Sequence, residues 1–242
     1  MFLSLLFACT AVEAEELPTV ESLLSGIDQN LTYETRMVRT EMDVVKPKRT
    51  KNYEFISYGR GVDEAATEFI APARDAGTKM LKKGDEMWMY MPSVEKVQKL
   101  SGHMLRQGMM GSDISYEDMM ESSSWLDAYN AEVTGSESAE GYDCWVIELT
   151  AKSDDVAYPK RKVWTDKVTL IPVKQELYAV SGVLLKTWLM TDIQEVEGRQ
   201  YPTRMVIDDA LQQGSKTEMR FTEMDFSVEL EDEVFSMRWL ER

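Results

Sequence analysis

Few side chains in this sequence have the types and spacing that catalysis requires. His103 is the single histidine, so a Ser-His-Asp triad, a Cys-His pair or a histidine-based zinc site would have to use it. The sequence contains no Gly-x-Ser-x-Gly, P-loop or Gly-x-Gly-x-x-Gly motif. We interpret His103 as a structural or surface residue. We therefore predict no catalytic residue, no cofactor and no enzymatic activity.

Acidic residues come closest to a metal-binding pattern between Asp113 and Glu121. Asp113, Glu117 and Glu121 fall four apart, so on a helix they would share a face and attract a cation, with Asp118 beside them. Acids are also common where a helix begins, because the macrodipole favours negative charge there, and the spacing of a calcium loop is not met. We expect no metal site. Paired carboxylates abound, so a small hydrolase of envelope material stays as an alternative.

Charge and length narrow the class of protein further. Forty-three acidic and 27 basic residues give a net charge of −16, which repels a phosphate backbone and argues against nucleic-acid binding. This charge also gives the molecule no overall attraction to anionic lipid headgroups. With 242 residues, no linker and no repeat, one domain is the simplest organisation. No apolar run long enough to span a bilayer follows the first dozen residues.

The N-terminus resembles an export signal. Residues 1–12 are apolar, and Val12-Glu13-Ala14 has the small-x-small form of a cleavage site, although no Lys or Arg precedes the apolar run. We expect residues 1–14 to be a cleaved signal peptide and residues 15–242 to form the mature domain. A hydrophobic first helix, or a lipobox-like Leu6-Phe7-Ala8-Cys9 with a lipid anchor at Cys9, are the alternatives. Either route of processing leaves Cys144 without a partner thiol, so we expect a small buried side chain there.

The hydrophobic pattern predicts a helix followed by many short strands. Residues 18–31 have helical spacing, and residues 33–100 and 131–226 alternate with a period of two between turn signals. Residues 101–129 differ, because methionines and glycines interrupt them and Ser115 with Asp118 forms a capping box. We predict a mainly β fold: a large curved antiparallel sheet of about eleven strands, an unclosed barrel, with helices packed on its concave face. Such an enclosure suits a lipid or acyl chain.

Several segments together resemble the outer-membrane lipoprotein-sorting family, which has the LolA-like fold. They run in order along nearly the whole mature chain: residues 70–78, Met87-Trp88-Met89-Tyr90-Met91-Pro92, residues 110–118, Pro172-Val173-Lys174, Leu185-Lys186-Thr187, residues 202–205 and Leu240-Glu241-Arg242. The resemblance implies a periplasmic carrier of lipidated proteins or lipid, and a partnership with an RND-type (MMPL-like) inner-membrane exporter. Family members usually have arginines between the Tyr-Met-Pro strand and the Met-Gly-Ser-Asp loop, and in this chain Lys96, Lys99 and Arg106 occupy that stretch.

Methionine is unusually abundant, with 17 residues, and its soft unbranched side chain suits either core filling or an adaptable apolar surface. A carrier must both bury and release acyl chains, which favours the second role. Our candidate lipid-binding residues are Trp88, Met104, Met109, Met110, Met119, Met120 and Trp125. The alternative function is an interaction subunit of an exporter that carries no cargo itself.

Overall fold

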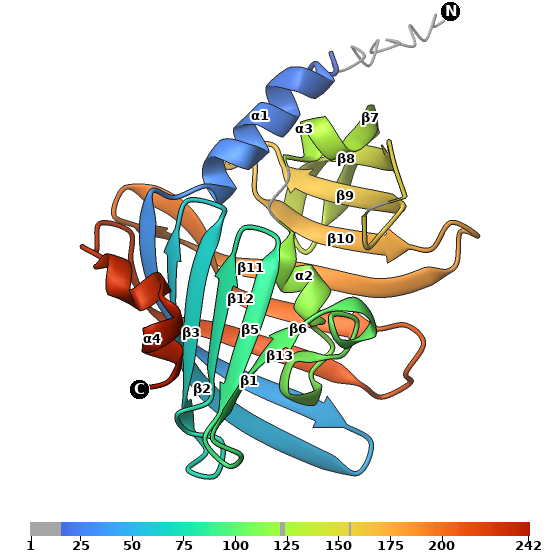
Figure 1. The fold of residues 1–242 in the computed structure, drawn as a ribbon. Helices are drawn as coiled ribbons and strands as arrows, with labels where there is room; N and C mark the ends of the chain where they lie inside the picture. Colours follow the sequence, from blue (N-terminus) through green and yellow to red (C-terminus); the bar gives the residue numbers. More distant parts are fainter. Residues whose placement is uncertain (1–15, 122–123, 155) are drawn as a thin grey trace, which may run out of the picture.

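A single sheet of thirteen antiparallel strands dominates the fold (Figure 1). The computed structural model describes residues 16–121, 124–154 and 156–242. The strands lie side by side in the order β6-β5-β4-β3-β2-β1-β13-β12-β11-β10-β9-β8-β7, and the outermost strands β6 and β7 do not pair. The strands are β1 Thr35–Lys46, β2 Arg49–Arg60, β3 Glu64–Ala71, β4 Lys79–Lys83, β5 Glu86–Met91, β6 Lys96–Leu100, β7 Tyr129–Ala139, β8 Tyr142–Ala151, β9 Lys160–Asp166, β10 Pro172–Tyr178, β11 Leu184–Val196, β12 Arg199–Asp209 and β13 Lys216–Asp225.

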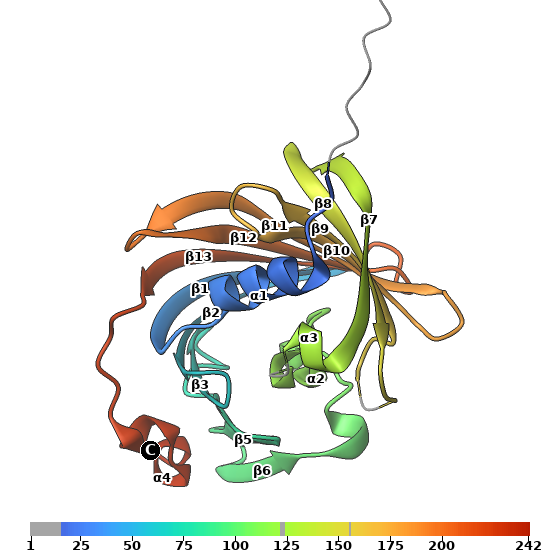
Figure 2. The same cartoon turned by 90° about the horizontal axis from the view of Figure 1, so that it is seen from above.

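The sheet curls around its own interior, so that α2 and α3 lie in the gap between β6 and β7 (Figure 2). This confirms the predicted unclosed, curved antiparallel sheet, with thirteen strands in place of about eleven. The alternation of apolar and polar residues breaks at Asp192 and so predicts two strands, over residues 184–190 and 192–196, whereas the structure has the single strand β11. Asp192 has a positive φ of 56°, and Asp192 and Thr203 opposite it drop out of the β11–β12 pairing without a shift of register. One residue of unusual backbone conformation therefore interrupts the alternation without ending the strand.

Strand β1 shows how alternation positions the interior. Val38, Thr40, Met42 and Val44 are all buried, as the period of two predicts. Met42 pairs with Tyr53 of β2 on one side and with Met219 of β13 on the other. These cross-strand neighbours share the concave face, so the centre of the sheet presents apolar side chains to the helices.

Helix α1 (Val20–Leu31) confirms the predicted first helix, which begins where the Thr19 hydroxyl accepts a hydrogen bond from the Ser22 N–H. Leu23, Leu24 and Ile27 are buried on one side of it and pack with Trp125 and residues of β7, β8 and β9. None of the helices in the described ranges is long and apolar enough to cross a bilayer. The predicted signal peptide and the lipobox-like Cys9 lie outside the described residues.

The Met-rich segment, residues 101–121, forms short helices and turns, as predicted. It holds the 3-10 turns η1 (Gly102–Met104) and η2 (Met109–Gly111) and the helix α2 (Tyr116–Met120). The Ser115 hydroxyl accepts from the Asp118 N–H while the Asp118 carboxylate accepts from the Ser115 N–H, so the predicted capping box is present. Helix α3 (Trp125–Ala128) follows and leads into β7.

The C-terminal residues cover the opposite, convex face of the sheet (Figure 2). Turn η3 (Asp232–Phe235) and helix α4 (Met237–Leu240) place Phe235 and Leu240 against Ala66 of β3 and Leu81 of β4. The C-terminal residues therefore cover the convex face of β3 and β4, and the Met-rich segment covers the concave face.

Candidate functional site

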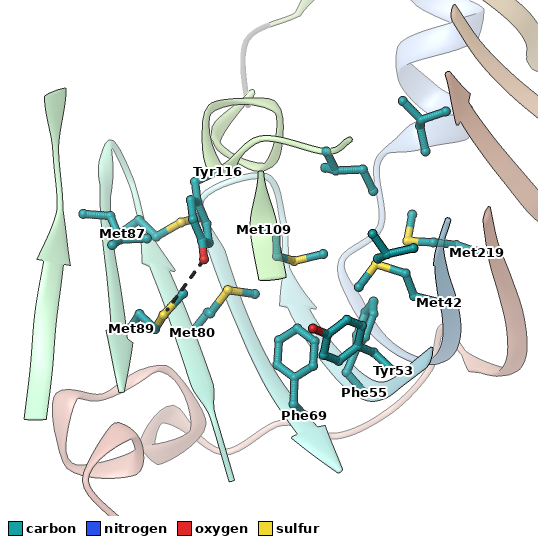
Figure 3. Close-up of a cluster of buried hydrophobic side chains, with 14 residues drawn as sticks. Met42, Tyr53, Phe55, Phe69, Met80, Met87, Met89, Met109, Tyr116 and Met219 are labelled. Carbon is teal, nitrogen blue, oxygen red and sulfur yellow. Dashed lines mark hydrogen bonds between the residues drawn. The ribbon is translucent and has the colours of Figure 1, made fainter. Parts of the chain in front are cut away.

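A methionine- and aromatic-rich cluster fills one end of the interior (Figure 3). Strands β4 and β5 supply Met80, Met87 and Met89, and the Tyr116 side chain from α2 points toward Met89. The Tyr116 hydroxyl lies 4.0 Å from the Met89 sulfur. Flexible thioethers make this packing easy to rearrange, because a methionine can repack at little cost.

Asp113 ties the Met-rich segment to the sheet. Its carboxylate, which has no exposed surface, lies 2.7 Å from the Lys46 ammonium of β1 and accepts a 2.7 Å hydrogen bond from the Thr217 hydroxyl of β13. The Ser215 hydroxyl also donates to it, and the Asp113 N–H donates to Thr217 at 2.8 Å. These bonds satisfy the buried carboxylate completely, which is the condition for burying a charge at acceptable cost.

Asp118 and Glu121 make two further connections across the interior. Asp118 accepts from the Lys186 ammonium of β11 and from the Tyr158 hydroxyl, each at 2.6 Å. Glu121 pairs at 2.7 Å with Arg161 of β9, whose guanidinium is buried beside the Trp125 and Tyr129 rings. The acidic side chains that could have attracted a metal cation therefore pair with lysine and arginine side chains of the sheet instead. Among the described residues, no group of three or more His, Cys, Asp or Glu side chains could hold a metal ion.

A cavity of about 410 Å³ lies between α1, the α2–α3 region and the concave face of β3, β4 and β11. Its apolar wall consists of Met119, Trp125, Trp188 and Met190. Its polar wall includes Arg36 of β1 and Lys82 of β4. A volume of this size falls within the range of small-ligand sites, and the mixture of walls suits a molecule with one apolar and one polar part.

A second hollow, of about 270 Å³, lies on the other side of α2. Leu105, Met120, Tyr129 and Arg161 contribute to its lining, and Glu121 borders both hollows. Helix α2 therefore presents consecutive methionines to different spaces, Met119 to the larger and Met120 to the smaller. A small displacement of this short helix would change both volumes together.

The candidate lipid-binding residues are distributed over this interior, with one exception. Met119 and Trp125 line the larger cavity and Met120 the smaller one. Met104, Met109 and Met110 belong to the methionine cluster, where Met109 is buried. Trp88 instead packs on the convex face with the C-terminal residues, and the Lys99 ammonium lies 5.6 Å from its ring centre. Trp88 therefore lies apart from the interior, because it alternates with Met87 and Met89.

The sequence reasoning missed the strand residues that complete the cavity: Arg36, Lys82, Trp188 and Met190. Trp188 and Met190 are two apart on β11, so alternation could have placed them on one face. The Lys82-Lys83-Gly84-Asp85 stretch is typical of a hairpin turn, but Lys82 lies within β4 with its ammonium 2.6 Å from the Val62 carbonyl oxygen. Burial lowers the pKa of Lys82. Only the curvature of the sheet brings Arg36 and Lys82 to the same cavity.

The remaining candidates for chemistry are not arranged for a reaction. His103 is exposed in η1. Cys144 is fully buried, and desolvation raises the pKa of its thiol to about 11, so it is a poor nucleophile near neutral pH. This agrees with its predicted role as a small buried apolar residue.

Comparison with solved structures identifies the fold. A structure of a DUF1329 family protein from Desulfovibrio piger superposes with a TM-score of 0.83 at 24% identity, covering 90% of this chain and 96% of that one. A lipoprotein-sorting protein domain from Vibrio parahaemolyticus gives 0.80 at 24% identity, with 93% and 100% covered. A LolA superfamily protein from Nitrosomonas europaea gives 0.76 at 25% identity, with 92% and 100% covered. No curated protein matches the sequence.

The fold and the lined cavity define a LolA-like protein, which confirms the resemblance to outer-membrane lipoprotein-sorting proteins. A family model with the description "Uncharacterized protein" matches residues 61–242, most of the chain, and the chain belongs to that family. The LolA-like fold agrees with the prediction that the chain is not an enzyme.

Proposed function

We propose that this protein is a periplasmic carrier that binds lipoprotein acyl chains or lipid in its interior cavity and serves outer-membrane sorting. The cavity of about 410 Å³ under α1, α2 and α3 carries the proposal, because its wall of Met119, Trp125, Trp188 and Met190 would desolvate a chain. Each methylene moved out of water contributes about 0.8 kcal/mol.

The Met-rich segment gives the carrier a means of release. Its methionines fill the interior beside the cavity, so an acyl chain can displace them and they can return when the chain leaves. The contacts of Asp113, Asp118 and Glu121 with the sheet hold the segment in place during this exchange. The methionines can thus repack around an acyl chain while the acidic contacts keep the segment on the sheet, so the chain can be enclosed and still be released.

Native mass spectrometry of the protein purified from its own envelope tests this proposal. We expect co-purified lipid or lipopeptide, and displacement of a bound fluorescent acyl probe by extracted lipid. A protein that carries neither and does not bind the probe is not an acyl carrier. Intact mass of the exported form would also test the cleavage expected after Ala14, against lipidation at Cys9.

A second candidate function, an interaction subunit of an RND-type exporter, has one observation in its favour. Val180, Val183 and Leu211 are exposed at the β10–β11 and β12–β13 turns, which adjoin through the Ala210 N–H and Leu185 carbonyl at 2.9 Å. Adjacent exposed apolar tips are typical of a contact surface. If V183E and L211E abolish co-purification of an inner-membrane exporter while probe binding is kept, this function is supported.

A further inference from the structure

Two cations of the larger cavity lack the direct ion pairs that many other cations of this protein have. Arg36 makes no ion pair with any residue in the described ranges, although it lines the cavity. Within the same ranges, the Lys82 ammonium has one hydrogen-bond partner, the Val62 carbonyl oxygen, and no ion pair. Burial lowers the pKa of Lys82, which is 5% exposed; the charge of Arg36 lowers it further, while Asp63 and Asp85 raise it. A buried or partly buried cation without a counter-ion is costly, so its retention calls for a reason.

The acids that line the same cavity do not supply this counter-charge. Glu64 is bound by Arg60 at 2.6 Å and by Lys83 at 3.3 Å, and Glu121 is bound by Arg161 at 2.7 Å. Asp28 accepts a hydrogen bond from the Ser124 hydroxyl. Because Glu64 and Glu121 are already neutralised, Asp28 is the one acid of the cavity lining in the described ranges without an ion pair. Asp63 and Asp85, outside this lining, offset part of the charge of Lys82, so Arg36 is the cation most in need of a counter-ion.

Trp188 adds a hydrogen-bond donor to this wall. Its indole Nε1 is buried and has no partner among the described residues, and the side chain lines the cavity. A buried N–H without an acceptor is rare and costs free energy. An oxygen atom of a ligand would satisfy it once a small rotation of the indole brings Nε1 to the surface of the cavity.

Gly59 shows that the position of Arg36 is built into the sheet. Gly59 is the direct cross-strand partner of Arg36, and a methyl group at this position would lie 2.6 Å from the Arg36 Nε. The absence of a side chain at position 59 lets Arg36 lie against β2 and face the cavity. Replacing Gly59 by alanine would move the guanidinium without removing its charge.

We propose that the cavity recognises an anionic amphiphile, whose head oxygens contact Arg36, Lys82 and the Trp188 indole while its chain lies along Met119, Trp125 and Met190. The shared chemistry is an oxyanion on an acyl chain, and a fatty-acid carboxylate and a phospholipid phosphate both provide it. This inference rests on the proposed carrier function, because it names the class of molecule that the carrier takes.

Equilibrium displacement of a fluorescent acyl probe by ligands with the same chain tests this inference. The ligands are palmitate, palmitoyl lysophosphatidylglycerol and the uncharged monopalmitoylglycerol. We expect at least one anionic ligand to bind about tenfold more tightly than the neutral one, as charge-assisted hydrogen bonds would give. R36M and K82M should bring the affinity for that ligand near the neutral level. G59A and W188F should weaken it by a smaller factor.

The matched control is R39M. Arg39 lies on the same strand but on the opposite face, where it pairs with Glu54 at 2.6 Å. R39M should leave all ligand affinities unchanged, and the neutral ligand reports whether the cavity of each variant is intact. A preference for palmitate identifies a carboxylate head, and a preference for the lysophospholipid identifies a phosphate head.

Two results would overturn the inference, and they differ in what they leave standing. If the neutral ligand binds as tightly as both anionic ligands and neither R36M nor K82M changes any affinity, head recognition is wrong and the carrier function stands. If none of the ligands binds the protein, both the head recognition and the carrier function are wrong.

Discussion

The Lys46 ammonium of β1 lies 2.7 Å from the Asp113 carboxylate of the Met-rich segment. Asp113 is fully buried while the Lys46 side chain keeps 22% of its surface exposed, so the acid is the more costly partner to leave alone. The pair joins residues 67 apart in sequence and places the methionine cluster over the centre of the sheet. The interior therefore depends on a charge contact as well as on apolar packing.

D113N should lower the free energy of unfolding by about 2 kcal/mol, because a neutral amide loses the charge-assisted bonds that the buried carboxylate accepts from Lys46, Ser215 and Thr217. Urea denaturation followed by tryptophan fluorescence measures this loss. The matched control is E86Q, which breaks the exposed Lys99–Glu86 pair and should change stability by less than about 1 kcal/mol. Equal losses for the two variants would show that Asp113 does not hold the segment.

The contact of Glu218 with Arg204 predicts a dependence of stability on acid pH. The hydrogen bond from Arg204 at 2.9 Å, with the nearby Arg220, lowers the pKa of Glu218 despite partial burial. The unfolded chain then binds more protons than the folded chain, so stability is full above the unfolded pKa of about 4.3. The stability is lost as the pH falls through the lower, folded pKa.

E218Q isolates this contribution. The variant should be less stable than the parent by about 1 kcal/mol at pH 7, because the carboxylate is partly screened by solvent. The difference should shrink as the pH falls below about 4.3, since the parent then also loses its charge. Thermal melts of both proteins across this pH range measure the difference in stability at pH 7 and its decrease in acid. A constant difference at every pH would contradict a role for the Glu218 charge.

Cys144 should resist thiol reagents in the folded protein. Its side chain is fully buried and its pKa is raised to about 11, so little thiolate forms at pH 8 and none is accessible. Labelling with a maleimide should be slow in buffer and fast in urea, with peptide mapping to separate Cys144 from Cys9. Rapid labelling without denaturant would show that β8 opens readily.

The sequence predicted the parts of the fold that depend on local patterns. Alternation in β1, the first helix and the Ser115–Asp118 capping box are visible in neighbouring residues, and each is confirmed. The continuity of β11 through Asp192 was not visible, because a single residue with positive φ looks like the end of a strand. Local sequence patterns therefore predicted the helices and strands more reliably than they predicted where one strand ends and the next begins.

The site was predicted only in part, for a related reason. The Met-rich segment stood out by composition, but Arg36, Lys82 and Trp188 come from distant strands whose alignment depends on the curvature of the whole sheet. Trp88 was assigned with its methionine neighbours, although alternation along β5 sends it to the other face. Whether a strand residue faces the cavity thus depends on register, which composition does not reveal.

Neighbouring methionines of α2 provide a matched pair of variants. Met119 lines the larger cavity and Met120 the smaller one, so M119Q and M120Q make the same chemical change in two different hollows from one helix. Glutamine is similar to methionine in length and helix propensity, so α2 should persist. If the acyl chain occupies the larger cavity, M119Q should weaken probe binding about tenfold, because the amide would be desolvated against the chain. M120Q should stay within about twofold, since its amide would lie outside the occupied cavity. The opposite order would place the chain in the smaller hollow, beside Arg161.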